Sequence, residues 1–377
     1  MIELGITSFG ETTPIEKTVQ TLSHGQRIRN LVEEIELADQ VGLDIFEIGE
    51  HHREDFAVSA PEMVLAAAAL NTKHIRLTSA VSILSSLAPI RVYEQYASLD
   101  ALSNGRAEIM ARRGSFTESF PLFGYDLKDY DQLFDEKLAM LLKVRKHPKL
   151  TWSGKFTQTV DNRSVYPRSV QKELPIWVAT GGNLDSTVKL AQLGLPIVYA
   201  TIGGDPKAFS QLVQVYKEIG SRYSHNPENL KVAAHSWGWI EEDSQSAIEN
   251  YFYATKQTVD NIAKDRPHWQ EMTKSQYLEA VGPDGAMFVG NPEEVAKKMI
   301  KIIETLQLDR FMLHIPVGSM PHEDTLRTIR LFGDEVAPIF PRDDLDHGEK
   351  VFIAFISFLQ PSNPSCEAEK QGGFSFS

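Results

Sequence analysis

Short runs of β-branched and other apolar residues alternate along the chain with longer stretches in which apolar positions recur at helical spacing. There are eight such runs, at residues 2–8, 44–49, 75–83, 107–112, 175–180, 196–201, 232–240 and 310–315. Strands separated by helical stretches are typical of parallel βα units. Eight units of this kind predict an α/β protein with the (β/α)8 TIM-barrel fold.

Three of the helical stretches carry their own start or stop residues. The stretch from residue 27 ends on Gly42, the next begins with Pro61, and the stretch after the fifth run closes with Gly194. Glycine is favoured just past the end of a helix and proline at its first position. These residues support helices between the predicted strands.

Two connections are too long for one loop and one helix, namely residues 114–174 and 241–309. Both follow the carboxyl ends of predicted strands, where the active sites of such barrels lie. We therefore predict insertions after strands 4 and 7. After Asp346 the helical period disappears, so we divide the chain into a barrel domain, residues 1–346, and a C-terminal appendage of unknown role, residues 347–377.

Composition argues against several classes of partner. The chain has 38 Lys and Arg against 51 Asp and Glu, a net charge of −13 that would repel nucleic acid and anionic membrane surfaces. Its one cysteine, Cys366, allows neither an internal disulfide nor a cysteine-built zinc site. The N-terminus lacks the pattern of a secretory signal, and the apolar run at 351–359 is too short to cross a bilayer. We expect a soluble, cytoplasmic protein.

The segment EIGEHHREDF, residues 47–56, places Glu50, His51 and His52 at the end of the second predicted strand. Adjacent residues of an extended chain point to opposite sides, so only one of the two histidines faces the barrel mouth. This geometry, and the absence of HExxH or similar spacing, argue against a metal site. On the residues alone, a hydrogen-bonded histidine at a strand end is favoured over a catalytic one.

Charged residues flank the fourth predicted strand on both sides. Asp100 and Arg106 lie on the turn that leads into it, and we predict a structural ion pair between them. Arg112 and Arg113 lie at its carboxyl end and are followed by Gly114. These two cations either pair with carboxylates of a loop or bind an anionic ligand at the barrel mouth.

The segment ATGGNLDSTVKLAQLG, residues 179–194, joins the fifth strand to a helix. Gly181 and Gly182 allow close approach of the backbone, Asn183 is a suitable N-cap, and Ser186 lies in the first turn. The free N–H groups and the helix dipole could therefore hold a phosphate. A plain tight turn is the alternative, and Asp185 in the first turn counts against an anion.

The sequence resembles the bacterial luciferase-like flavin monooxygenase family through four segments in order: EIGEHH, TSAVSILSSLAPIRVYEQYASLDALSNGRAEIMARRGS, PIWVATGGNLDSTVKLAQLGLP and FVGNPEEVAKKM. The resemblance covers about residues 1–342, and its second segment is the most specific. The family fold is a (β/α)8 barrel, in agreement with the eight runs.

The resemblance implies roles for particular residues. His51 would lie beside the flavin ring and serve in proton transfer. A non-proline cis peptide beneath the ring would fall between Ser79 and Ala80. The phosphate of the cofactor would be bound by Arg113 and by the turn after the fifth strand, at Thr180, Gly181, Gly182 and Ser186.

The resemblance also implies FMN as the cofactor, supplied in reduced form (FMNH2) by a separate flavin reductase. The protein would use O2 to oxidise a small organic substrate, with the loop after the seventh strand as a lid. A homodimer is expected through the helices after the second and third strands, where residues 64–70 form an alanine-rich face. Three alternatives stay open: an F420-dependent oxidoreductase, a flavin-binding protein without turnover, and, last, a metal-dependent barrel hydrolase.

Overall fold

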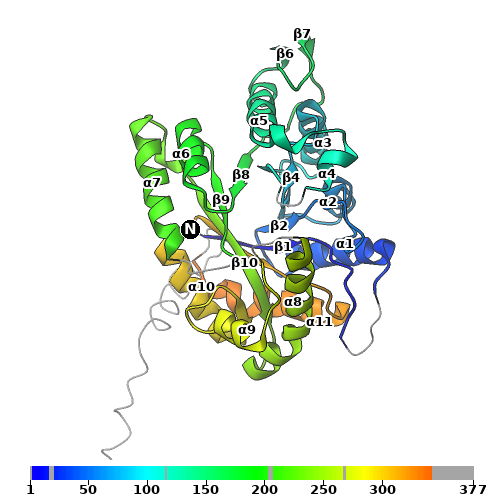
Figure 1. Ribbon diagram of the computed structural model, residues 1–377, viewed down its shortest axis with the longest axis vertical. Helices are drawn as coiled ribbons and strands as arrows, with labels where there is room; N and C mark the ends of the chain where they lie inside the picture. Colours follow the sequence, from blue (N-terminus) through cyan, green and yellow to red (C-terminus); the bar gives the residue numbers. More distant parts are fainter. Residues whose placement is uncertain (1, 17–20, 115–116, 203–206, 266–268, 342–377) are drawn as a thin grey trace, which may run out of the picture.

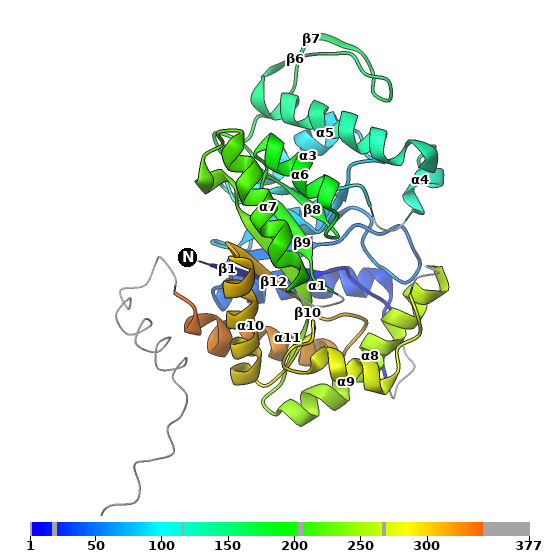
Figure 2. The ribbon, with the colours of Figure 1, turned by 60° about the vertical axis from the view of Figure 1, so that its left-hand side comes forward.

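The structure is a computed structural model that describes residues 2–16, 21–114, 117–202, 207–265 and 269–341, so the predicted appendage lies outside the described residues. A mostly parallel sheet curves into a nearly closed barrel with helices around it (Figures 1 and 2). Its strands are β1 (Glu3–Ser8), β2 (Ile45–Ile48), β3 (Arg76–Ser79), β4 (Ser82–Ile83), β5 (Ile109–Arg112), β8 (Ile176–Thr180), β9 (Ile197–Ala200), β10 (Val232–Ile240) and β12 (Arg310–His314). Each of the eight predicted runs contains a strand, and the third contains two.

The hydrogen-bonded order of the strands is β3-β2-β1-β12-β10-β9-β8-β5-β4, with parallel pairs throughout. The two ends of this path belong to the same predicted run. A parallel bridge between Leu77 and Ala107 brings β3 next to the start of β5. The third run therefore pairs with β2 in its first half and with β5 in its second, which nearly closes the ring.

Helices cover the outside of the barrel between successive strands (Figure 2). Pro61 and Pro89 each stand in the first turn of a helix, and Gly42 and Gly194 follow helix ends with φ of 74° and 64°. These observations confirm the predicted boundaries at Gly42, Pro61 and Gly194, and Pro89 begins a helix in the same way. The helices are α1 (His24–Gln40), α2 (Pro61–Ala69), α3 (Pro89–Leu102), α6 (Leu184–Leu193), α7 (Ala208–Arg222), α10 (Pro292–Leu306) and α11 (His322–Leu331), with short helical turns η2 (Pro227–Asn229), η3 (Phe332–Val336) and η4 (Ala337–Ile339).

The two long connections contain structure of their own. The segment between β5 and β8 holds α4 (Ser119–Leu122), η1 (Leu127–Asp129), α5 (Tyr130–Lys146) and the hairpin of β6 (Lys149–Trp152) and β7 (Val160–Ser164), at the top of Figure 1. The segment between β10 and β12 holds α8 (Ser244–Asp265), α9 (Lys274–Val281), β11 (Phe288–Gly290) and α10. Within the described ranges, no helix combines the length and the apolar character needed to cross a membrane.

The interior of the barrel is filled by one apolar layer above one charged layer. The apolar layer consists of Ile45, Met110, Trp177, Val198, Ala233 and Met312, all nearly inaccessible to solvent. Such close-packed layers make the centre of the barrel a core and not a channel. The charged layer lies below it, at the amino ends of the strands.

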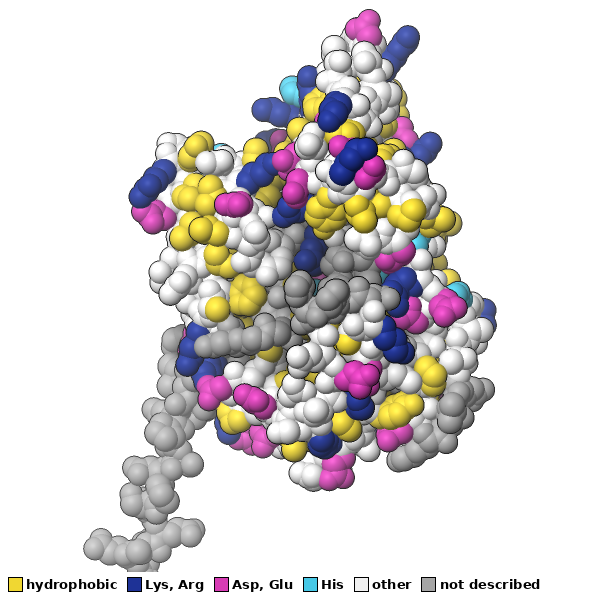
Figure 3. Space-filling model, viewed as in Figure 1, with side chains coloured by type: hydrophobic (Ala, Val, Ile, Leu, Met, Phe, Trp, Pro, Cys, Tyr) yellow, Lys and Arg dark blue, Asp and Glu magenta, His cyan; other side chains and the backbone are white. Residues whose placement is uncertain are grey.

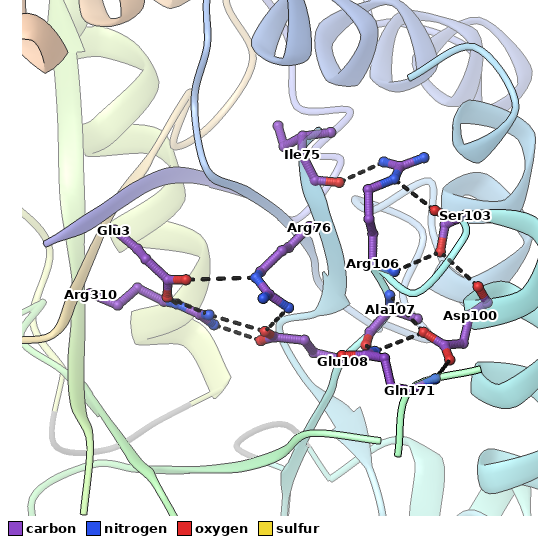
Figure 4. Close-up of polar contacts among 10 residues, drawn as sticks. All are labelled: Glu3, Ile75, Arg76, Asp100, Ser103, Arg106, Ala107, Glu108, Gln171 and Arg310. Atoms are coloured by element: carbon purple, nitrogen blue, oxygen red, sulfur yellow. Dashed lines mark hydrogen bonds and ion pairs between the residues drawn. The ribbon is translucent and has the colours of Figure 1, made fainter. Parts of the chain in front are cut away.

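Arg310 is the centre of the charged layer (Figure 4). Its guanidinium donates to Glu108 at 2.8 and 3.2 Å and to Glu3 at 2.8 Å, and Arg76 donates to Glu108 at 3.1 Å. Burial alone would raise the pKa of Glu108, but the charges of Arg310 and Arg76 outweigh burial and hold that pKa below its usual value. We refer to Glu3, Arg76, Glu108 and Arg310 as the basal ion cluster.

The predicted ion pair between Asp100 and Arg106 is wrong, because each side chain binds other groups (Figure 4). Asp100 accepts from both nitrogens of Gln171, at 3.0 and 2.7 Å, and from the backbone N–H of Ala107 at 3.3 Å. Arg106 donates mainly to backbone carbonyls, those of Ala69, Thr72, Ile75 and Ser103. The five N–H groups of a guanidinium suit the carbonyls left without partners at the end of α2.

Glu47 adds a second buried carboxyl group to the interior, and it predicts a pH effect. Burial raises the pKa of Glu47 to about 8 from an ordinary 4.5, against an opposing effect of Arg310, and Thr7 donates to it at 2.8 Å. Between pH 4.5 and about pH 8, Glu47 is protonated in the folded state and ionised in the unfolded state. The contribution of Glu47 to the free energy of unfolding therefore falls as the pH rises through this range.

Glu47→Gln should remove this contribution. We expect the free energy of unfolding of the variant, relative to wild type, to increase between pH 5 and pH 8, as measured by urea unfolding at both pH values. Glu218→Gln, at an exposed surface pair with Arg222, serves as the control and should show no such trend. A difference for Glu47→Gln that is constant with pH would contradict the assignment.

Candidate active site

A small cavity of about 40 Å³, partly open to solvent, lies at the carboxyl ends of the barrel strands. We refer to it as the central cavity. Most of its wall is apolar, and it rests directly on the apolar interior layer, since Met110 and Val198 belong to both. The polar side chains on its wall are those of Glu50, His51, Arg112 and His235.

His51 is held between aromatic rings at the edge of the central cavity. Its ring stacks on Phe56 at a centroid distance of 4.2 Å and lies 5.0 Å from Phe9. His52 turns the other way, with Nε2 3.0 Å from a Glu50 oxygen and its ring edge-on to Phe123. The histidine pair is therefore split as strand geometry predicts, and His51 is the member that lines the cavity.

Glu50, whose role the sequence left undecided, connects two strands. One carboxylate oxygen accepts the backbone N–H of Ile83 on β4 at 3.0 Å, and the other lies 3.0 Å from His52. Only 4% of the residue is exposed. It fixes the end of β2 against β4 on the wall of the cavity.

The cis peptide bond predicted between Ser79 and Ala80 lies one residue further on, between Ala80 and Val81. Ser79 is still paired in register with Ile48 of β2, and the N–H of Ala80 donates to the Ile48 carbonyl at 2.6 Å. The chain therefore stays paired with β2 up to Ala80 and separates from it at the cis peptide bond between Ala80 and Val81. Ala80 and Val81 line the central cavity, whereas the Ser79 hydroxyl lies behind the wall, 2.9 Å from Ser82 Oγ.

A second cavity of about 280 Å³ lies between α5 and α6, and we refer to it as the anion cavity. Three of the predicted phosphate-binding residues line it: Arg113, Thr180 and Ser186. Arg113 Nη2 donates to Ser186 Oγ at 2.5 Å, and Asn183 caps α6 by accepting the N–H of Ser186 at 3.1 Å. Figure 3 shows basic and acidic side chains together in the hollow between these helices.

The double glycine shapes the turn without lining the anion cavity. Gly182 has φ of 92°, and a side chain there would meet the ring of Phe209 at 2.8 Å, so the turn requires glycine at this position. A side chain at Gly181 would lie 3.4 Å from the Arg112 guanidinium, a flexible neighbour. The structure thus gives Gly182 a conformational role.

Sequence reasoning missed the other charges of the anion cavity. Arg113 forms an ion pair with Asp131, and Lys189 forms one with Asp135, both carboxylates being on α5. Lys189 follows Ser186 by three residues on one face of α6, a spacing that could have revealed it. Asp185 of α6 also lines this cavity, which thus has three carboxylates and two cations, so an anionic ligand would have to replace Asp131 on Arg113 and Asp135 on Lys189.

His235 of β10 was also missed, because a histidine inside an apolar strand is usually a core residue. It is 8% exposed and lines the central cavity together with His51. Burial lowers the pKa of His235 to about 3, and the charges of His314 and Arg112 act in the same direction. Its imidazole is therefore neutral at physiological pH.

A sequence model of luciferase-like monooxygenases matches residues 7–309 of the chain. The chain belongs to the luciferase-like monooxygenase family. It is 25% identical over 334 residues to the N-acetyl-S-alkylcysteine monooxygenase of Bacillus subtilis, covering 84% of this chain and 93% of that protein. It is also 25% identical over 326 residues to the alkanal monooxygenase alpha chain of Aliivibrio fischeri, covering 79% of this chain and 89% of that protein.

Solved structures share the fold of this family member at low sequence identity. The oxygenating constituent of 3,6-diketocamphane monooxygenase from a Pseudomonas putida plasmid, solved with FMN, matches with a TM-score of 0.69 and 18% identity, over 89% of this chain and 98% of that one. The F420-dependent tetrahydromethanopterin reductase of Methanopyrus kandleri matches with a TM-score of 0.67 and 18% identity, over 90% and 99%. In the described parts of the chain, no group of three or more His, Cys, Asp or Glu is arranged to hold a metal ion.

Proposed function

We propose that this family member is an FMN-dependent monooxygenase that uses reduced flavin and O2 to oxidise a small organic substrate. The observation that carries the proposal is the pairing of two cavities across β5 and β8. One is apolar with His51 at its edge, and the other contains Arg113, Ser186 and the capped start of α6. An apolar wall suits a flavin ring, and a guanidinium with hydroxyls at a helix N-terminus suits a phosphate.

Bound flavin would supply the activation of O2. Arg113, Thr180 and Ser186 would hold the phosphate, and the apolar side chains around Met110 and Val198 would exclude water. His51, fixed by Phe9 and Phe56, would accept or donate a proton beside the ring. The long segment after β10 is the lid we propose.

The decisive experiment is a titration of the purified protein with FMN under reducing conditions, followed by admission of air. Saturable binding and a changed course of flavin re-oxidation, both followed by absorbance, support the proposal. Absence of FMN binding contradicts it. The same titration with F420 addresses the second candidate, which an F420-dependent solved neighbour of the same fold favours. FMN binding without any effect on re-oxidation would indicate a flavin-binding protein without turnover.

Arg113→Ala should weaken the binding of FMN far more than the binding of riboflavin, because only FMN carries the phosphate. A hydrogen bond to a charged group contributes about 1.5–3 kcal/mol, so we expect the dissociation constant for FMN to rise roughly tenfold or more. Fluorescence titration with both ligands measures this. Arg91→Ala, which removes an exposed arginine of α3, is the control. Equal weakening of both ligands would show that Arg113 does not bind the phosphate.

We propose that a separate flavin reductase supplies the reduced flavin, that the protein acts in the cytoplasm, and that it forms a homodimer.

Support for the dimer comes from α2 and the residue that follows it, where Met63 and Leu70 are 68% and 71% exposed beside small alanines. A second copy of the chain would cover this face. Leu70→Glu should then shift the protein from dimer to monomer in sedimentation velocity, and an unchanged sedimentation coefficient would rule out this face.

A further inference from the structure

His235 differs from the other side chains of the central cavity by its depth in the barrel. On β10 it is paired in register with Ala200 of β9 and Met312 of β12. Ala233, two residues earlier, belongs to the apolar interior layer. Because side chains alternate along a strand, His235 points to the same interior and lies one layer nearer the mouth.

The ring of His235 has polar atoms that nothing in the described part of the chain satisfies. Neither Nδ1 nor Nε2 has a hydrogen-bond partner among the described residues. Because only 8% of the residue is exposed, bulk water does not replace these partners freely. The ring nitrogens of the neighbouring His314 also lack a hydrogen bond among the described residues, with a Glu11 carboxylate oxygen 3.1 Å from Nε2, but His314 does not line the central cavity as His235 does. Buried polar atoms without partners are rare because they are unfavourable, so this ring indicates a ligand in the cavity.

The charge state of the ring limits the chemistry of that ligand. Since burial and nearby charges keep the pKa of His235 far below physiological pH, its imidazole has one N–H donor and one acceptor nitrogen. A carboxylate or phosphate would use only the donor. The two nitrogens point away from each other, so a ligand in the cavity meets one of them. A neutral group that carries both an N–H and a carbonyl oxygen can pair with whichever nitrogen faces the cavity.

We propose that His235 is a ligand-binding residue of the central cavity that hydrogen-bonds the imide edge, C(=O)–NH–C(=O), of the flavin ring. This rests on the proposed function. The dimethylbenzene end of the flavin offers no hydrogen-bonding group, and it suits the apolar wall around Met110 and Val198. His235 lies on β10, two strands beyond β8 in the barrel order, so it reaches the cavity from another side than Arg113.

The test compares FMN with FMN methylated at the imide nitrogen. Methylation removes the donor of the imide edge and leaves the phosphate unchanged. We expect wild type to bind FMN about tenfold more tightly than the methylated compound, and His235→Ala to bind both with similar affinity. His235→Gln, which keeps a donor and an acceptor, should restore part of the preference. Fluorescence quenching gives the dissociation constants, and circular dichroism checks the fold of each variant.

His225→Ala is the matched control, since His225 is a half-buried histidine outside both cavities, with Nε2 2.7 Å from the Gln192 carbonyl. It should keep the preference of wild type. The same preference in His235→Ala as in wild type, with FMN still bound, overturns the role of His235 and leaves the proposed function intact. Failure of wild type to bind FMN overturns both.

Discussion

Arg310→Met is expected to lower the free energy of unfolding by about 3–5 kcal/mol, the usual cost of removing one partner from a buried ion pair. Arg310 is 1% exposed, and its loss leaves Glu108, 2% exposed, with an ion pair to the partly exposed Arg76. Methionine fills much of the vacated volume, so the loss is mainly electrostatic. Urea unfolding followed by circular dichroism measures it.

A surface pair provides the comparison for this large effect. Arg327 and Asp324 on α11 are also an ion pair, at 3.3 Å, but both side chains are exposed. Arg327→Met should change the free energy of unfolding by less than about 1 kcal/mol. A similarly small change for Arg310→Met would show that the basal ion cluster contributes little to stability.

His51→Ala is expected to leave FMN affinity within a few-fold of wild type and to slow the oxygen reaction by about 100-fold or more, the range typical of a lost general acid or base. The reason is that His51 lies at the edge of the central cavity and away from the anion cavity. Stopped-flow absorbance of bound reduced FMN mixed with oxygenated buffer measures the rate.

The adjacent histidine gives a control at nearly the same place in the chain. His52 contacts Glu50 and Phe123 and does not line the central cavity. His52→Ala should therefore retain most of the rate of wild type. If His51→Ala reacts with oxygen at the wild-type rate, His51 does not act in proton transfer and is only a strand-end residue that packs against aromatic neighbours.

Much of the fold could be predicted from the sequence because strand and helix periods are local properties of the chain. Gly194 and Pro61 mark helix boundaries through their own backbone preferences, whatever surrounds them. The break in the third run could not be predicted in the same way. It depends on a change of partner, from β2 before Ala80 to β5 after Val81, which is visible only once the sheet is assembled.

The contrast between local sequence properties and contacts made only in the assembled fold also explains which site residues were predicted and which were missed. Arg113 and Ser186 lie 73 residues apart, and the resemblance to a family brought them together before the structure did. Asp131 and His235 have no local pattern that sets them apart from surface or core residues. The ion pair predicted between Asp100 and Arg106 failed for a related reason. Their closeness in sequence does not reveal the backbone carbonyls that bind Arg106 or the Gln171 amide that binds Asp100.

The basal ion cluster also affects the route by which molecules enter and leave the central cavity. With Arg310 and its carboxylates at one end and the layer of Trp177 and Met312 above them, the amino end of the barrel is filled by buried side chains. The central cavity lies at the opposite end, at the carboxyl ends of the strands, so the described residues leave that end as the side from which molecules approach. For two molecules that enter from this side, we expect the one bound deeper in the cavity to bind before the one above it and to leave after it.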